Sequence, residues 1–165
     1  MQMTAAARSP VGPDLRAVPD VVLWPRSSTL GPLGALPTVP RLARAFTEMV
    51  LGGWGLDELT DSGKLIISEL ATNAFRAAEG ADGQPRYHDG YGLPVVWLRL
   101  MSNRQRLRIE VWDNVPAVPA ARHADPDEES GRGLEIVASL SENWGWDHMP
   151  AIGAKAVWAT LLTVH

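Results

Sequence analysis

Two short segments, at positions 95–101 and 106–112, are rich in β-branched and aromatic residues. Each is too short for a helix of the length expected elsewhere in the chain, and the polar residues between them, 102–105, suit a hairpin turn. Apolar residues alternate with charged or aromatic ones along the second segment, as in a strand that buries one face. Because strands joined by a short turn pair antiparallel, the sequence predicts an antiparallel sheet.

Other segments carry apolar residues at the spacing of a helix or form short β-rich runs. Gly52-Gly53 marks the end of the first helix, and Asp57 or Asp61 the start of the second. We expect helices over 38–53, 57–80 and 134–140, and two further strands over 142–146 and 155–164. Hairpin-linked strands with helices gathered on one side indicate an α+β fold. The expected architecture is a two-layer α/β sandwich with a mostly antiparallel mixed sheet and helices on one face, not a doubly wound parallel sheet.

The 165 residues fit one domain. Residues 1 to about 20 mix Ala, Arg, Pro and Gly without a period, and we expect residues 1–36 to form a flexible N-terminal segment. An apolar run near 21–24, stopped by Pro25, predicts one edge strand in it, and the Gly and Pro residues of 31–37 predict a loop. The folded domain is then 37–165.

Composition excludes several classes of function. With 15 basic and 19 acidic residues, the formal charge of -4 gives no general attraction to nucleic acid or to an anionic membrane. There is no cysteine, which excludes disulfides and thiolate metal sites, and the four histidines lack metal-ligand spacing. No apolar run approaches the roughly 20 residues that span a bilayer. The N-terminus does not have the pattern of a signal peptide, so we expect a cytoplasmic protein.

The second helix carries polar residues where an apolar surface is expected. Glu69 and Asn73 are four residues apart, which stacks them on one helix face, and Arg76 lies close to the same line. A carboxylate and an amide at the edge of an apolar helix are costly to bury without partners. They therefore mark a candidate site, unless Glu69 lies in solvent or pairs with Arg76.

A second candidate is the carboxylate at the end of the segment 106–112. Alternation places Asp113 on the apolar face of that strand, where an unpaired carboxylate would cost several kcal/mol or take up a proton. Asp113 therefore requires a donor. A simpler alternative is that Asp113-Asn114 caps the turn at the end of the strand.

The third candidate follows residues 114–130, which are rich in Pro, Ala, Asp and Glu. A structureless stretch longer than about 12 to 15 residues is usually functional or disordered. It leads into Gly131-Arg132-Gly133-Leu134 at the start of a helix. Such glycines expose amide N–H groups, and a helix N-terminus attracts phosphate.

In this order and spacing, the three features resemble the GHKL ATP-binding fold shared by gyrase-type ATPases, Hsp90 and histidine-kinase catalytic domains. The nearest likeness is to the bacterial anti-sigma-factor serine/threonine kinases. Ser-Glu-Leu-x-Thr-Asn-Ala (68–74) is similar to their asparagine box, and Gly-Arg-Gly-Leu-x-Ile-Val (131–137) to their second glycine box. Lys-x-Val-Trp-Ala (155–159) is similar to their final strand, and Trp-Gly-Leu (54–56) to a connector. The resemblance covers about 37–162.

The resemblance implies roles for the three candidates, with ATP and Mg²⁺ as cofactors. Asn73 would hold Mg²⁺, a hard cation that takes oxygen ligands. Glu69 would be the catalytic general base, and Asp113 would accept from the adenine amino group. Residues 114–130 would form a lid over the triphosphate. The phosphates would lie against the second glycine box, which consists of Gly131, Arg132, Gly133 and Leu134.

Two residues depart from the family pattern. Ala77 stands where close relatives often carry a histidine, and Ala156 where the family usually has a threonine that helps to hold adenine. Asp113 is followed by Asn-Val-Pro, without the glycine of the first glycine box. These departures concern nucleotide affinity and turnover more than the fold.

The implied function is an ATP-binding regulatory protein that transfers the γ-phosphate of ATP to a serine or threonine of a partner protein. The implied partner is an anti-sigma factor antagonist or a sigma factor. We expect no binding to nucleic acid or to a membrane, and the resemblance leaves open whether the protein forms a homodimer. One alternative is a catalytically weak or inactive GHKL module that acts through protein contacts in partner switching. Another is a relative of histidine-kinase catalytic domains that acts on a separate histidine domain.

Overall fold

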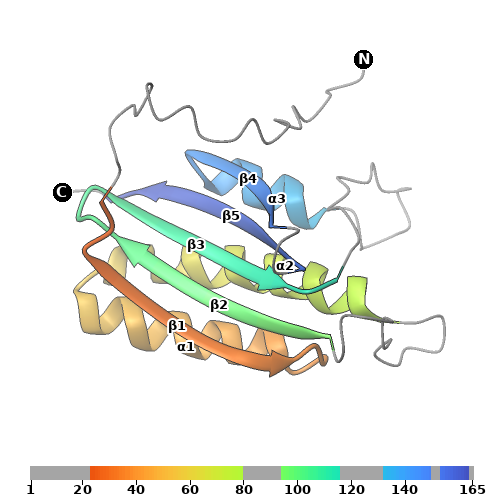
Figure 1. The fold of residues 1–165 in the computed structure, drawn as a ribbon. Helices are drawn as coiled ribbons and strands as arrows, with labels where there is room; N and C mark the ends of the chain where they lie inside the picture. The colour runs from red at the N-terminus through yellow and green to blue at the C-terminus, as the bar shows by residue number, and fades with distance from the viewer. Residues whose placement is uncertain (1–22, 80–93, 116–131, 150–152, 164–165) are drawn as a thin grey trace, which may run out of the picture.

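The structure is a computed structural model, which describes residues 23–79, 94–115, 132–149 and 153–163 (Figure 1). Strands and helices follow one another as β1 (Arg26–Gly34), α1 (Val39–Trp54), a short 3-10 helix (Asp57–Leu59), α2 (Thr60–Ala78), β2 (Val95–Ser102), β3 (Arg106–Asp113), α3 (Gly133–Leu140), β4 (Asn143–Met149) and β5 (Ala154–Leu162).

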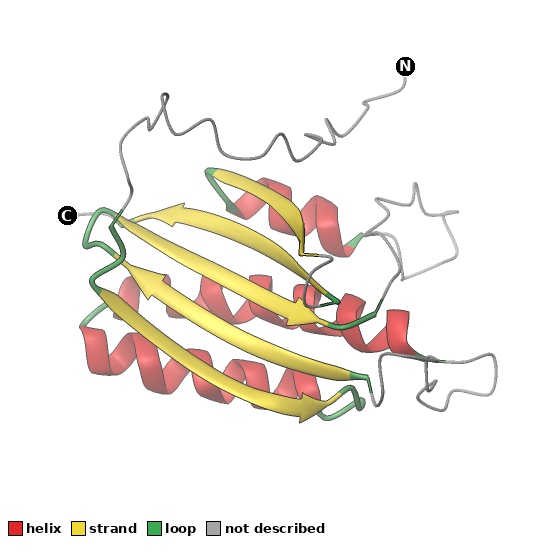
Figure 2. Cartoon of the chain, in the orientation of Figure 1, coloured by secondary structure: helices red, strands yellow, loops and turns green. Residues whose placement is uncertain are grey.

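The strands form one five-stranded sheet in the order β1-β2-β3-β5-β4, and all three helices lie on one face of it (Figure 2). The α+β fold predicted from the sequence is confirmed. The sheet is wholly antiparallel, however, and not mixed. The reason is that β5 lies between β3 and β4, which run in the same direction, so these two strands do not pair with each other.

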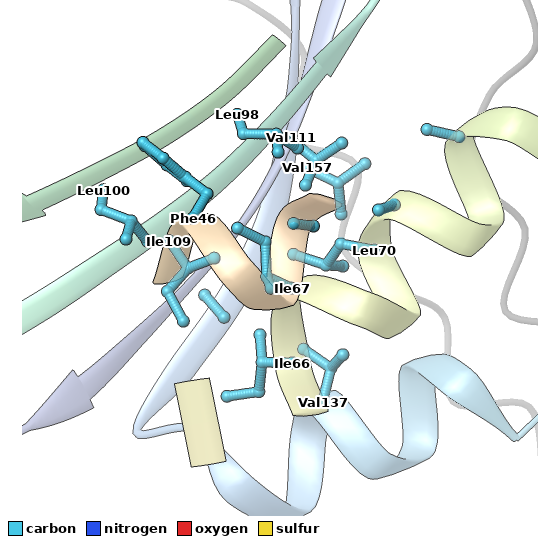
Figure 3. Close-up of a cluster of buried hydrophobic side chains, with 14 of the residues drawn as sticks. Phe46, Ile66, Ile67, Leu70, Leu98, Leu100, Ile109, Val111, Val137 and Val157 are labelled. Atoms are coloured by element: carbon cyan, nitrogen blue, oxygen red, sulfur yellow. The ribbon is translucent and has the colours of Figure 1, made fainter. Parts of the chain in front are cut away.

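The core fills the space between the sheet and the helices (Figure 3). Alternation along β3 turns Ile109 and Val111 toward the helices, where α2 presents Ile66, Ile67 and Leu70, and all five side chains are at most 2% exposed. Burying one such side chain stabilises the fold by roughly 1.5–3 kcal/mol. This face of α2 is therefore held firmly, and it positions the polar residues next to it.

The hairpin turn predicted at 102–105 joins β2 to β3. Asn103 Oδ1 accepts hydrogen bonds from the backbone N–H groups of Gln105 and Arg106, at 3.1 and 2.8 Å. Arg104 has φ 71, in the left-handed region. An Asn side chain that bonds the backbone two residues on is a common way to close a tight turn.

The edge strand was predicted near 21–24, but β1 spans Arg26–Gly34 and pairs with β2. Positions 21 and 22 lie outside the described residues. The loop predicted over 31–37 is wrong up to Gly34, because an edge strand with a register shift between Leu30 and Leu33 accommodates Pro32. The N-terminal segment 1–36 therefore contributes a full strand of the sheet, anchored where Arg26 Nη1 donates to Trp54 O at 2.7 Å.

The first helix was predicted to end at Gly52-Gly53, but it continues to Trp54. Gly55 ends it instead, with φ 68 in the left-handed region and its N–H directed at the carbonyls of Gly52 and Leu51. A glycine in this conformation is the usual residue just beyond a helix C-terminus. Both residues of Gly52-Gly53 are simply exposed positions within the last turn.

The face of the sheet away from the helices carries a buried carboxylate. Glu110 is 3% exposed and accepts hydrogen bonds from Arg99 Nε at 2.8 Å, Arg108 Nε at 2.6 Å and Trp112 Nε1 at 2.7 Å. The Arg108 guanidinium also lies 4.2 Å from the ring centre of Trp158, in a cation–π contact. Glu110 thus connects three outward side chains of β2 and β3.

No helix among the described residues has the length and apolar content needed to cross a lipid bilayer.

Candidate functional site

Glu69 and Asn73 lie one turn apart on α2, and both side chains are half-buried. Within the described part of the chain, no hydrogen bond holds either side chain, and no ion pair joins Glu69 to the exposed Arg76. The alternative in which Glu69 pairs with Arg76 is therefore wrong. The two side chains present carboxylate and amide oxygens that remain available to a ligand.

The start of α3 lies against these two side chains. A β-carbon placed on Gly133 would lie 2.7 Å from Glu69 Oε2 and 3.6 Å from both Asn73 Oδ1 and Asn73 Nδ2. A side chain at position 133 would therefore have to displace the carboxylate end of Glu69. The asparagine box and the second glycine box, separated by about 60 residues of sequence, thus meet at one place.

The other residues of the second glycine box divide by role. Leu134 is 6% exposed and belongs to the hydrophobic core, so it fixes α3 on the domain. Arg132 is exposed at the N-terminal cap of α3. The first amide N–H groups of an α-helix have no partners within the helix. Gly131 lies outside the described residues, as does nearly all of the predicted lid at 114–130.

Asp113 ends β3 on the face toward the helices and is only 1% exposed. Its Oδ1 accepts from Lys155 Nζ at 2.9 Å and from the Val115 N–H at 2.9 Å. Lys155 lies directly opposite it on β5 and also donates to Val115 O at 3.0 Å. The predicted need for a donor and the alternative of a turn cap are both met, because Asp113 pairs with a lysine and closes the turn at Val115.

Burial raises the pKa of the Asp113 carboxyl above its ordinary value. The charge and the hydrogen bond of Lys155, together with the Val115 N–H, offset only part of this rise. Two charges removed from water lose hydration, which their mutual attraction returns only when the geometry is good. The Asp113–Lys155 pair is thus a costly arrangement that apolar packing alone does not require.

The strand register also corrects the expectation for Ala156. Lys155 faces Asp113 across β3 and β5, whereas Ala156 is opposite Trp112. Because neighbouring residues of a strand point to opposite faces, Ala156 lies on the far side of the sheet from Asp113. The residue beside the candidate adenine acceptor is therefore Lys155, whose role the sequence pattern did not indicate. Ala77, the other departure, is exposed near the end of α2.

These parts gather at one end of the molecule. Figure 1 shows the C-terminal end of β3, the C-terminal half of α2 and the start of α3 on the same side. α2 contacts both β3 and α3, so one helix connects the two halves of the site. The described residues contain no cluster of three or more His, Asp or Glu that could hold a metal ion by themselves.

Residues 34–160 match the family model of the histidine kinase-like ATPase domain. The chain belongs to the histidine kinase-like ATPase family. The match covers more than half of the chain, from the end of β1 to β5, and includes all seven candidate site residues. A histidine kinase-like ATPase domain is of the GHKL kind and implies ATP binding. No curated protein matches this chain.

The described residues of this ATPase domain fit a nucleotide. Asp113 is a nearly sealed carboxylate whose two hydrogen bonds both end on Oδ1. Gly133 brings the backbone at the amide-rich start of α3 directly against the polar side-chain ends of Glu69 and Asn73. A magnesium ion usually binds one or two protein oxygens and completes its shell with phosphate and water. A single oxygen from Asn73 is compatible with this kind of coordination.

Proposed function

We propose that this ATPase domain is a serine/threonine protein kinase that regulates a sigma factor through a partner protein. The observation that supports this proposal best is the approach of Gly133 to Glu69 and Asn73. A carboxylate, an amide and the N-terminal end of α3 lie close together there, and a helix N-terminus attracts phosphate. Phosphoryl transfer needs mainly positioning and charge stabilisation, and these three groups are suited to it.

Each residue has a distinct task in this proposal. Asp113 accepts from the adenine amino group, and the start of α3 donates backbone N–H groups to phosphate oxygens. Asn73 would supply an oxygen ligand to Mg²⁺, which would neutralise phosphate charge when bound. Glu69 takes the proton of a partner hydroxyl as that oxygen bonds to the γ-phosphorus, while the bridging oxygen leaves with ADP.

Nucleotide binding is tested first, by calorimetric titration of Mg-ATP into the wild type, Asp113→Ala and Asn73→Ala. Saturable binding that Asp113→Ala abolishes and that loses its Mg²⁺ dependence in Asn73→Ala supports the site. Glu58→Ala serves as the matched control, because Glu58 is an exposed carboxylate in the short 3-10 helix before α2 and is not one of the candidate residues. A folded wild type that binds no Mg-ATP at millimolar concentration overturns the proposal.

Transfer is tested next, with γ-labelled ATP and candidate anti-sigma factor antagonists. Acid-stable label on serine or threonine of the partner, absent with Glu69→Gln, supports the kinase. Acid-labile label on a histidine would assign the activity of a histidine kinase instead. ATP binding without any transfer, unchanged in Glu69→Gln, would leave a regulatory module that works through protein contacts.

A further inference from the structure

Lys155 occupies a buried position, which is unusual for a lysine. Its side chain is 5% exposed, and its ammonium group donates to two oxygens, Asp113 Oδ1 and Val115 O. A lysine is almost never fully buried unless it is paired. The pair is not part of the hydrophobic core, so apolar packing does not account for it.

The two carboxylate oxygens of Asp113 differ in their hydrogen bonding. Lys155 Nζ and the Val115 N–H both bind Oδ1, and within the described residues no donor binds Oδ2. An ionised carboxylate only accepts hydrogen bonds, whereas a protonated one also donates. The charge on Asp113 therefore decides what kind of group Oδ2 can pair with.

Purines differ in whether the group at position 6 donates or accepts a hydrogen bond. Adenine carries an exocyclic amino group, a donor, and guanine or hypoxanthine carries a keto oxygen, an acceptor. An anionic Asp113 pairs with the first and repels the second. A protonated Asp113 donates to the second.

We infer that Lys155 determines the base specificity of the site, by keeping Asp113 anionic and oriented so that it selects a 6-amino purine over a 6-keto purine. This inference rests on the proposed nucleotide site and adds a positioning residue to it. Lys155 is the charged group whose field opposes the effect of burial on the Asp113 pKa. Across β4 and β5, the titratable group opposite Lys155 is His148, which is exposed.

The test compares the binding of ATP and of ITP, whose base carries the 6-keto group, at pH 6 and pH 8.5. The proteins are the wild type, Lys155→Met, Asp113→Asn and the double variant. Lys64→Met is the matched control, because Lys64 is a less buried lysine that pairs with Glu48 on the surface of α1 and α2. A thermal melt of each protein verifies folding.

The wild type and Lys64→Met should prefer ATP over ITP about tenfold or more at both pH values, because the wrong base leaves a buried group unpaired. Lys155→Met should lose this preference as the pH falls, because only the Val115 N–H then opposes protonation of the buried Asp113. Asp113→Asn should prefer ITP at both pH values, since Lys155 and Val115 still bind its oxygen and leave the amide N–H groups toward the base. A merely structural role for Lys155 would not produce this pH-dependent exchange of bases.

A folded Lys155→Met that keeps the full ATP preference at both pH values overturns the inference and leaves the proposed function intact. A wild type that binds neither nucleotide overturns the proposed function itself. If Lys155→Met does not fold, the double variant carries the test, because it buries no charge. It should show no preference for ATP and no pH dependence, and a retained ATP preference there overturns the inference.

Discussion

The backbone of Gly133 approaches the carboxylate of Glu69 so closely that a β-carbon at position 133 would lie 2.7 Å from Oε2. Gly133 is the first residue of α3, and Glu69 lies in the middle of α2. Their approach brings together the two sequence segments that carry the candidate site residues of α2 and α3. It also makes the position sensitive to a single methyl group.

Gly133→Ala should therefore displace the Glu69 side chain and weaken Mg-ATP binding or phosphoryl transfer about tenfold or more, while the fold stays stable. The fold should tolerate the change because the atom nearest the new β-carbon is the end of the Glu69 side chain, which can rotate away. Calorimetry and a thermal melt measure the two effects. Gly53→Ala is the control, because a β-carbon there meets nothing within 4 Å. Unchanged binding and transfer in Gly133→Ala would contradict the prediction.

The Asp113–Lys155 pair should show strong coupling in a double-mutant cycle. Asp113→Asn or Lys155→Met alone removes one partner of a buried pair, which typically costs about 3–5 kcal/mol of unfolding free energy. The double variant buries no charge and should recover most of that loss. Urea unfolding of the four proteins gives the coupling. Losses that simply add would show that the two side chains do not interact in solution.

Glu110 should contribute to stability mainly above acid pH. Burial raises the pKa of Glu110, but the hydrogen bonds from Arg108, Trp112 and Arg99 outweigh it and hold the pKa below the ordinary value of 4.5. Its contribution is therefore present above pH 4.5 and is lost as the pH falls through the lowered pKa. Glu110→Gln should destabilise the protein by about 1–3 kcal/mol at pH 7 and flatten the acid side of the stability profile.

Glu142→Gln is the control for Glu110→Gln. Glu142 also pairs with an arginine, through Arg106 Nε at 2.7 Å, but on the surface. Exposed ion pairs contribute about 0–1 kcal/mol. Equal losses for the two variants, measured by urea unfolding at pH 7 and pH 4, would refute a special role for the buried carboxylate.

Gly55→Ala should cost about 1–2 kcal/mol of unfolding free energy, because φ 68 at this helix end is unfavourable for any residue with a β-carbon. Space is not the cause, since a β-carbon at Gly55 meets nothing within 4 Å. A thermal melt beside Gly53→Ala, which should be neutral or stabilising, separates backbone strain from helix propensity. Equal melting temperatures for the two variants would argue against the strain.

Much of this fold was predictable because its signals are local. The hairpin at 102–105 follows from two alternating segments and a polar turn, and the α2 face follows from its apolar spacing. The edge strand was misplaced because Ser27, Ser28 and Thr29 are polar. They owe their strand conformation to pairing with β2, which no local pattern expresses.

The candidate site was predictable in part for the same reason. Alternation along β3 placed Asp113 on the inner face, and helical spacing placed Glu69 beside Asn73. Lys155 was missed as the partner of Asp113, because that contact depends on the register between β3 and β5, 42 residues apart in the chain. A buried network such as that of Glu110 likewise depends on cross-strand neighbours.

The position of β5 has a consequence for the order of assembly. β5 is synthesised after β3 and β4, yet it lies between them. During translation β4 has no neighbour in the sheet until β5 emerges and inserts. The same strand delivers Lys155 to Asp113, so the buried carboxylate acquires its counter-charge only when the sheet closes. The nascent chain therefore cannot form the Asp113–Lys155 pair before its sheet is complete.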